Sequence, residues 1–200
     1  MASTPTTRDR MLQVAFDLFH AQGVQGTPVE QILQASGTGK SQLYHYFGSK
    51  EGLVHAVVEH FAARQAEGGG PGGAGLRTLK DLETWFHAFV EFTERTGFSR
   101  ICPMATIAGG LEPDQVETRE CIAAIFAGAS GKLEALFQHM RAGGELPEDT
   151  DCTALADTCL IVMQGGLLVS RIRKDSRPFR NAIAQVLAHI RSLRTYPTAS

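Results

Sequence analysis

The stretch TPVEQILQASGTGKSQLYHYFGSKEGLVHAV, residues 27–57, decides between two different folds. Its centre, GTGKS, resembles the end of a phosphate-binding loop, whose full pattern is G-x-x-x-x-G-K-[ST]. With Gly39, Lys40 and Ser41 in the last three positions, the first glycine would have to stand at position 34, where the chain has Gln34. A phosphate-binding loop also follows a buried strand, so the residues before the glycines decide the question.

The residues before the glycine turn have the pattern of a helix. Thr27 and Glu30 have the spacing of a capping box, in which the threonine accepts from the backbone of Glu30 and the glutamate reaches back. Pro28 would take the first helical position, where its missing N–H costs little. Val29 and Ile32 begin an apolar stripe at helical spacing. We therefore reject a nucleotide-hydrolysing enzyme and expect two helices joined by a turn.

Composition sets the broad class of protein. The chain has 200 residues, of which 43% are hydrophobic and 20% charged, and its net charge is −2. These values are typical of a soluble globular protein, and DNA binding would have to come from a local basic patch. We expect no apolar run near the roughly 18 residues of a membrane span and no signal-peptide core, and hence a cytoplasmic protein.

The four cysteines show no CxxC pairing, so we expect free, buried thiols. His55, Glu59 and His60 lie close in sequence, but their spacing does not put three ligands on one helix face. We expect neither a metal nor another cofactor.

Hydrophobic periodicity predicts an all-α chain of about nine helices. Gly128 and Gly131 are expected to interrupt the seventh helix, and the glycine-rich residues 67–75 to form a flexible loop or linker. We expect a DNA-binding domain over 1–48, a connecting helix over 49–67, and a ligand-sensing and dimerisation domain over 68–200. The expected helices are 7–22, 28–36, 40–47, 50–66, 76–96, 103–110, 113–142, 151–174 and 178–194.

Three short helices near the N-terminus, the last two joined by a glycine turn, describe a helix-turn-helix unit. Residues 27–57 closely resemble the DNA-binding domain of TetR-family transcriptional regulators, whose pattern there is T-x-x-x-I-A-x-x-A-G-V-S-x-G-x-L-Y-x-Y-F-x-x-K-x-x-L. The chain departs from it at Leu33, at Thr38-Gly39 and at Ser41. The matching residues are Thr27, Ile32, Gly37, Leu43, Tyr44, Tyr46, Phe47, Lys50 and Leu53.

The recognition helix of such a unit packs one face and presents the other to DNA. Leu43 and Phe47 can face inward with Tyr46 beside them, which leaves five side chains for the groove. Gln42 can read adenine in bidentate fashion, and Lys40 can reach guanine or a phosphate. In the family a serine caps this helix, and here either Thr38 replaces it or the cap is weak. The expected groove residues are Lys40, Ser41, Gln42, Tyr44 and His45, and the expected phosphate contacts are Thr27, Tyr44 and Lys50.

Charge supports this interface, though weakly. Residues 38–50 contain two lysines, one histidine and no acid, which favours DNA over a merely solvated helix face. Across residues 1–66, however, five basic residues are balanced by five acidic ones. We therefore expect weak non-specific affinity for DNA.

A single recognition helix contacts few bases, so helix-turn-helix proteins bind palindromic sites as dimers. The last two helices should form the dimer surface, as the resemblance also implies. LIVMQGGLLVSRI, residues 160–172, is more apolar than one buried face requires, and Gly165-Gly166 would let another helix approach closely. RIRKDSRPFR, residues 171–180, carries five basic residues against one acid and is expected to be a solvated rim, with a membrane-surface role as a weaker alternative.

An aromatic stripe at Trp85, Phe86, Phe89 and Phe92 is either plain core or part of a pocket. The resemblance implies a small effector bound among these helices, and such pockets are mostly apolar. By favouring one sensor conformation, the effector would displace the helix after Ser49 and with it the recognition helices. The expected lining residues are Trp85, Phe89, Cys102, Met104, Phe126 and Met163, with His87, Gln138 and Gln164 as possible polar contacts.

The resemblance implies a ligand-responsive homodimeric regulator, most often a repressor, and not an enzyme. An alternative switch is oxidation or alkylation of Cys102, which precedes Pro103 at an expected helix start where a thiolate is favoured. A buried, inert thiol is the plainer explanation. An enzyme and a helical protein-interaction module are the rival classes, but no catalytic constellation stands out in the sequence.

Overall fold

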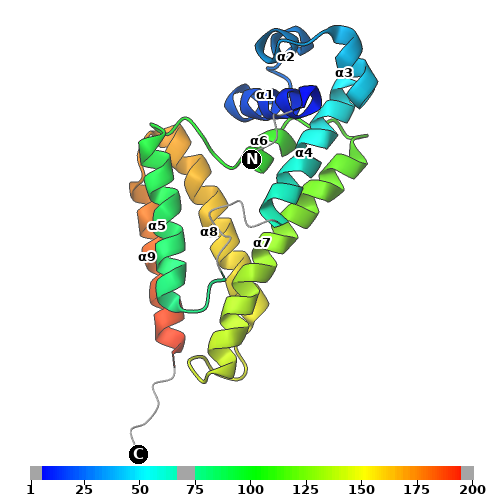
Figure 1. Cartoon of the computed structure of the whole chain (residues 1–200). Coiled ribbons are helices and arrows are strands. Elements are labelled where there is room, and N and C mark those ends of the chain that lie inside the picture. The colour runs from blue at the N-terminus through cyan, green and yellow to red at the C-terminus, as the bar shows by residue number, and fades with distance from the viewer. Residues whose placement is uncertain (1–5, 67–74, 195–200) are drawn as a thin grey trace, which may run out of the picture. The chain divides into compact units, whose positions relative to one another are not determined.

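The computed structural model describes residues 6–66 and 75–194, and every regular element in these ranges is an α-helix (Figure 1). The predicted all-α fold is confirmed. Of the glycine-rich residues 67–75, predicted to form a flexible loop or linker, 67–74 lie outside the described residues. The helices are α1 (Thr7–Gln22), α2 (Val29–Ser36), α3 (Lys40–Phe47), α4 (Lys50–Ala66), α5 (Leu79–Arg95), α6 (Pro103–Ala108), α7 (Val116–Ala142), α8 (Cys152–Arg173) and α9 (Arg177–Leu193).

Internal contacts divide the chain into two compact units. The first comprises residues 1–67 and 102–125, and the second comprises 68–101 and 126–200. Because the division falls within α7, this helix begins in the first unit and ends in the second. The structure thus groups α6 and the start of α7 with the N-terminal helices. The predicted division by function, into a DNA-binding domain over 1–48, a connecting helix over 49–67 and a sensing and dimerisation domain over 68–200, stays a prediction.

In the first unit, α1 packs against α2, α4 and α6, and α3 packs against α4. The buried face of α1 includes Leu12, Ala15 and Phe19, each at most 1% exposed. Burying side chains of the size of Leu or Phe stabilises a fold by about 1.5–3 kcal/mol each. Thr6 begins the helix with a capping box, and its hydroxyl hydrogen bond holds the pKa of Asp9 below its usual value. Because α3 packs against α4, which itself packs against α1, this core holds α3 in position.

Two details of the helix ends differ from the sequence prediction. Pro28 is the N-cap of α2 rather than its first helical residue, and no side chain caps that helix. The Thr27 hydroxyl instead donates to the carbonyl oxygen of Gly23 at 2.7 Å, because Thr27 is fully buried at the end of the preceding loop. At the start of α4, the Ser49 hydroxyl accepts from the Gly52 N–H at 3.0 Å.

The predicted interruption of α7 at Gly128 and Gly131 is wrong, because the helix runs unbroken over 27 residues. A glycine inside a helix costs about 1 kcal/mol relative to alanine. The helix tolerates that cost because its packing continues beyond the glycines, where it buries Leu133, Leu136 and Phe137.

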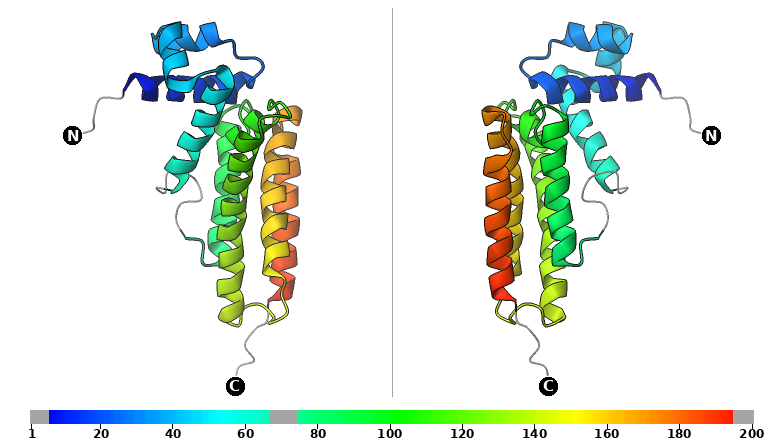
Figure 2. Two further views of the ribbon diagram at one scale, coloured as in Figure 1. Left: turned by 90° about the vertical axis from the view of Figure 1, so that its right-hand side faces the viewer. Right: turned by 90° about the vertical axis from the view of Figure 1, so that its left-hand side faces the viewer.

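The second unit is a set of long helices in which α8 and α9 lie side by side and α5 packs against both (Figures 1 and 2). The buried faces contribute Met163 and Leu167 from α8 and Phe179, Ile183 and Ile190 from α9. The core of this unit therefore lies between these three helices.

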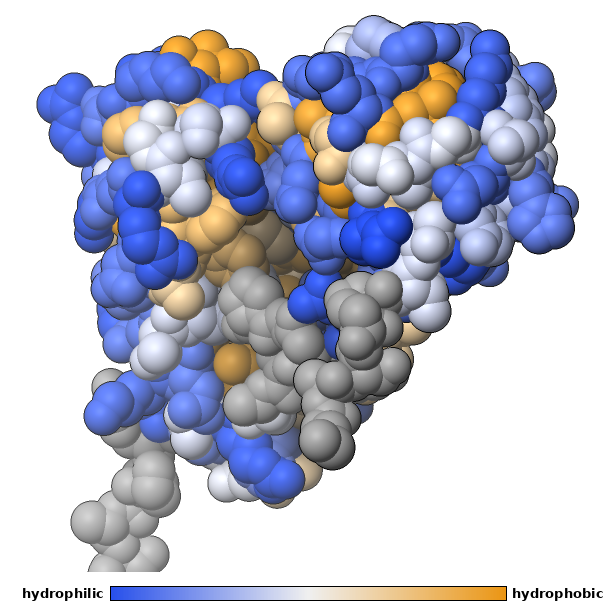
Figure 3. All heavy atoms as spheres, turned by 45° about the horizontal axis from the view of Figure 1, so that its top comes forward, coloured by the Kyte–Doolittle hydropathy of each residue, from blue (hydrophilic) through white to orange (hydrophobic). Residues whose placement is uncertain are grey.

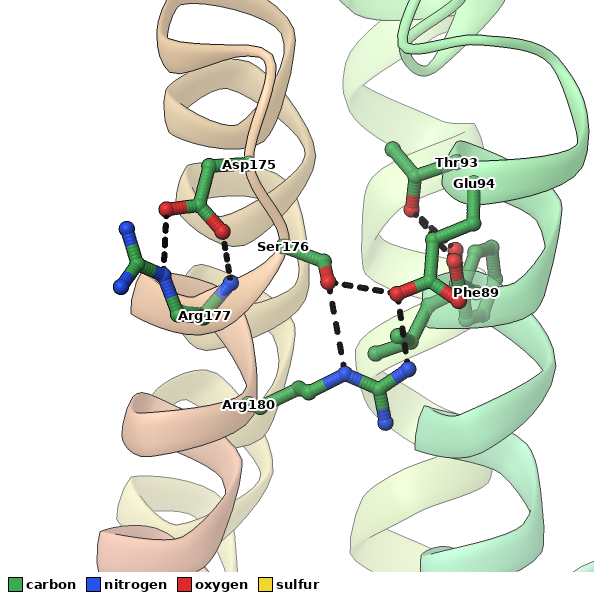
Figure 4. A network of polar contacts seen from close by, with 8 residues as sticks. Phe89, Thr93, Glu94, Asp175, Ser176, Arg177 and Arg180 are labelled. Carbon is green, nitrogen blue, oxygen red and sulfur yellow. Dashed lines mark hydrogen bonds and ion pairs between the residues drawn. The ribbon is translucent and has the colours of Figure 1, made fainter.

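Polar contacts tie the turn between α8 and α9 to α5 (Figure 4). A carboxylate oxygen of Glu94 accepts from the Ser176 hydroxyl at 2.6 Å and from Nη2 of Arg180 at 2.7 Å. These two hydrogen bonds, that from Ser176 first, lower the pKa of Glu94. Asp175 pairs with Arg177 at 2.7 Å. The segment predicted to be a solvated basic rim therefore has two of its five cations in ion pairs.

The sequence predicts that Gly165-Gly166 lets another helix approach closely, and within the chain Gly166 alone has such a neighbour, which is α9. A Cβ built at Gly166 would overlap the ring of Phe179, which is fully buried in α9. Gly165 faces outward, and a Cβ there would meet nothing within 4 Å. Gly166 is thus needed for packing within the chain.

We expect Gly166→Ala to lower the free energy of unfolding by about 1–3 kcal/mol, because an extra methyl group over-packs the core. Urea denaturation at matched protein concentration measures the effect. The control is Gly128→Ala on α7, where a Cβ meets no atom within 4 Å. That variant should gain up to about 1 kcal/mol from helix propensity. Equal stability of Gly166→Ala and the wild type would contradict the packing argument.

The α8 helix is the one described helix long and apolar enough to cross a membrane by length and composition. The prediction that no segment approaches such a length is therefore wrong for residues 152–173. The core helix of a soluble protein meets the same criterion, and Cys159, Met163 and Leu167 of α8 are buried within the second unit.

Candidate nucleic-acid interface

The α3 helix is held by one deeply buried side chain and exposes most of its other side chains to solvent. Leu43 is fully buried, and Phe47, one turn later, is half-buried. The five side chains predicted for the groove are all exposed, among them Tyr44 at 46%. In the space-filling view, hydrophilic residues cover much of the surface over the N-terminal helices, with apolar areas between them (Figure 3). The five residues predicted for the groove, all exposed, are Lys40, Ser41, Gln42, Tyr44 and His45.

Aromatic contacts order this surface. The Lys40 ammonium lies 6.0 Å from the centre of the Tyr44 ring, one turn further along α3. His45 meets Tyr46 edge-on, with 5.3 Å between the ring centres. Tyr46 was expected beside the inward residues, but it is 40% exposed, because Leu43 and Phe47 alone fill the packed face. Tyr46 is therefore a further exposed aromatic group on α3.

The start of α3 is organised differently from the prediction. Gly39 is the N-cap, and Oε1 of Gln42 accepts from its N–H at 3.0 Å. Thr38 does not cap the helix, because its hydroxyl shares a 2.6 Å hydrogen bond with that of Ser36. Gly37 ends α2 with a φ of +65°, a left-handed conformation that suits glycine. No acidic residue stands in the first turn of α3, so its N-terminus keeps the positive end of the helix dipole.

The predicted phosphate contacts fall into two groups. Lys50 is half-exposed at the start of α4 and remains accessible. Thr27 is fully buried, and its hydroxyl is bonded to Gly23 and to Nε2 of Gln22, at 2.7 and 3.3 Å. A buried, satisfied hydroxyl is not available to a phosphate, so we leave Thr27 out of the interface.

Sequence reasoning missed Arg8 as a neighbour of α3. Its guanidinium lies 5.6 Å from the centre of the Phe47 ring, and its side chain is exposed. Arg8 therefore adds a cation near the C-terminal end of α3. The sequence alone does not show that an arginine in the first turn of α1 lies near α3, because that contact arises from tertiary packing.

The predicted effector residues are divided between the two units. Trp85 is buried on α5 and lies 5.0 Å from the Phe89 ring centre, in an edge-on contact. Phe126 and Met163 also belong to the second unit, whereas Cys102 and Met104 belong to the first. Of the possible polar contacts, His87 and Gln138 are exposed and Gln164 is half-buried. A pocket shared by these residues stays a prediction.

Among the described residues, no group of three His, Cys, Asp or Glu side chains could hold a metal ion. The four cysteines are free, with Cys152 and Cys159 buried and Cys102 and Cys121 half-buried. The expectation of buried thiols therefore holds for two of the four.

Comparison with known proteins identifies the family. Residues 11–57 match the family model of bacterial regulatory proteins of the tetR family, and residues 78–186 match the model of the Tetracyclin repressor-like C-terminal domain. The second match alone covers more than half of the chain. This chain belongs to the TetR family of transcriptional regulators, which are DNA-binding proteins.

Relatives match along most of their length. An uncharacterized HTH-type transcriptional regulator of Mycobacterium tuberculosis is 29% identical over 182 residues, covering 86% of this chain and 87% of the relative. The HTH-type transcriptional repressor AcnR of Corynebacterium jeikeium is 24% identical over 187 residues, covering 91% and 90%. The HTH-type transcriptional repressor ComR of Escherichia coli is 26% identical over 169 residues, covering 82% and 79%.

Solved structures share the fold. The regulatory protein TetR from Rhodobacter sphaeroides has a TM-score of 0.74 at 23% identity, covering 92% of this chain and 98% of that protein. A cysteine mutant of the TetR-family regulator CifR, complexed with 26-bp double-strand operator DNA, has a TM-score of 0.76 at 22% identity, covering 94% and 98%. At this identity the likeness shows the fold alone.

Proposed function

We propose that this protein is a cytoplasmic, homodimeric repressor that binds a palindromic operator through α3 and leaves it when a small apolar or aromatic effector binds. One observation carries the proposal. In the segment that matches the family model, Leu43 anchors α3, and its outer face carries six exposed polar or aromatic side chains and no acid. Such a face suits the edges of bases and the phosphates beside them.

The side chains of this face suit different parts of a duplex. Lys40 and Gln42 stand at the N-terminal end of α3, the end that helix-turn-helix proteins direct at base edges. Tyr44 and Lys50 are suited to phosphates. Ser41 and His45 can contact either base edges or phosphates. Thr38 lies just before α3, with its hydroxyl hydrogen-bonded to that of Ser36.

The second copy is supported by the outer surface of α8. Its apolar side chains Ile161, Leu168 and Ile172 are 69%, 48% and 72% exposed and recur at helical spacing. Large exposed apolar rows of this kind mark interaction surfaces. A two-fold dimer through α8 and α9 would cover this row and place two copies of α3 at half-sites of a palindrome.

The effector is the least defined partner. Trp85 and Met163 are buried and Phe89 and Phe126 half-buried, so apolar surface is available in the second unit. An effector that binds better to the conformation with displaced recognition helices would release the operator. Membranes have no part in this proposal.

Selection from random DNA duplexes tests the function directly. We expect the wild-type protein to enrich a palindrome whose half-sites are separated by about 10 base pairs or a multiple, the spacing of one or more helical turns. Sequencing of the bound pool after several rounds gives the motif. Recovery of unenriched, random sequences would contradict an operator-binding protein.

A second candidate switch is Cys102, which is half-exposed at the N-cap of α6. The other thiols are less suited to reaction. Burial raises the pKa of Cys159 to about 12, and burial together with the charge of Glu59 raises the pKa of Cys121. N-ethylmaleimide should then release wild-type protein but not Cys102→Ser from the selected operator. Equal release of both proteins would rule out Cys102 as the switch.

A further inference from the structure

The amide of Gln42 has a defined orientation at the start of α3. Its polar atom faces the N–H of Gly39 at 3.0 Å. A backbone N–H can only donate, so the side-chain atom that faces it must be the oxygen Oε1 rather than Nε2. The usual ambiguity between the two ends of an amide is therefore resolved by its partner.

The consequence is that Gln42 presents donors to its surroundings. With Oε1 turned towards Gly39, the two N–H groups of Nε2 remain, and the side chain is exposed. Lys40, two residues earlier, carries an ammonium group, which has donors and no acceptor. The first turn of α3 holds no acid. This end of the helix thus offers hydrogen-bond donors and positive charge.

Bases in the major groove differ in what they require. Adenine presents the acceptor N7 and the donor N6–H₂, so bidentate reading by an amide uses both its nitrogen and its oxygen. Guanine presents two acceptors, N7 and O6. The two donors of Nε2 match the two acceptors of guanine, whereas thymine offers only the acceptor O4. Bidentate reading of adenine would require the oxygen that caps α3 to accept a second hydrogen bond from N6–H₂.

We propose that Gln42 keeps its oxygen on Gly39 while it binds DNA and reads guanine through Nε2. Each operator half-site then carries guanine at the position that faces Gln42. This replaces the sequence-based expectation of adenine. It rests on the proposed function, because it specifies the base that the same surface selects.

Gln42→Glu is the decisive variant, because it separates the cap from the contact. A carboxylate oxygen can take over the hydrogen bond from Gly39 and is favoured at a helix N-terminus. It has no donor for guanine and can instead accept from the N4–H₂ of cytosine. Gln42→Ala is the matched variant that loses both the cap and the contact.

The experiment is selection from random duplexes with the wild type, Gln42→Glu and Gln42→Ala. We expect guanine at one position of each wild-type half-site, a change towards cytosine there with Gln42→Glu, and no preference there with Gln42→Ala. In the wild-type operator, 7-deazaguanine at that position should weaken binding roughly tenfold, within the range of one good base contact. The same replacement should leave Gln42→Ala unaffected.

Other outcomes overturn the proposal in distinguishable ways. Adenine at the Gln42-dependent position, with weaker binding on 7-deazaadenine, would mean that Oε1 accepts from the base and that the amide reads adenine in bidentate fashion. A motif that is identical for all three proteins would mean that Gln42 reads no base. Absence of any motif for the wild type would remove the proposed function together with this inference. Thermal melts followed by circular dichroism should give Gln42→Glu the same melting temperature as the wild type, because the variant retains the cap of α3.

Discussion

Replacing Lys40, Gln42 and Tyr44 together by alanine is expected to abolish specific operator binding while the fold is retained. All three side chains are exposed on α3, so their loss leaves the buried anchor Leu43 in place. Specific sites are bound about 10³-fold or more tighter than random DNA, and base contacts supply much of that difference. Because both copies of α3 lose their contacts, we expect a loss of at least about a thousandfold.

Fluorescence anisotropy with the selected operator, at one fixed salt concentration, measures this loss, since salt alone changes such affinities strongly. The control is Lys132→Ala, which removes an exposed lysine from α7 in the other unit. That variant should bind like the wild type. Circular dichroism verifies the helical content of both variants. A triple variant that binds within about threefold of the wild type would show that α3 is not the reading surface.

The fold was predictable because periodicity and glycine turns act locally. The stripe of α1 and the left-handed Gly37 are visible in the sequence, and the predicted bounds of α1 and α3 agree with the structure. The exposure of the α3 side chains followed from the same reasoning, because once Leu43 is buried, residues on the opposite side of the helix must face outward.

Hydrogen-bond partners could not be predicted in the same way. A threonine hydroxyl before a helix can cap that helix or bond an earlier carbonyl, and Thr27 does the second because Gly23 lies within reach. Thr38 was the natural candidate to cap α3, yet Gln42 occupies the cap from within the helix. These choices depend on distances between loops that no periodic pattern encodes.

The effector residues show a second limit of sequence reasoning. The sequence predicts Trp85 and Met104 to line a pocket, and both side chains are buried. It does not say which buried residues meet, because that depends on how segments far apart in sequence pack. Contacts assign Trp85 to one unit and Met104 to the other.

Ile161→Glu combined with Ile172→Glu is expected to convert the proposed dimer into monomers. Both side chains are about 70% exposed on the same face of α8, so neither substitution disturbs the core of the protomer. Burial of one isoleucine at an interface contributes about 1.5–3 kcal/mol, and the pair occurs twice in a two-fold dimer. The substitutions also place charges where they would be desolvated. The dissociation constant of the dimer should therefore rise by at least about a thousandfold.

Sedimentation equilibrium provides the measurement, because one chain has a mass of 21.6 kDa and a dimer has twice that. The matched control is Val116→Glu, which changes an apolar residue that is 49% exposed at the start of α7 and should leave the dimer intact. The monomeric variant should also lose most of its affinity for a full palindrome but bind a single half-site as weakly as the wild type does, because dimerisation links two weak contacts into one strong one. Persistence of the dimer in the double variant would place the interface elsewhere and leave the exposed row of α8 for another partner.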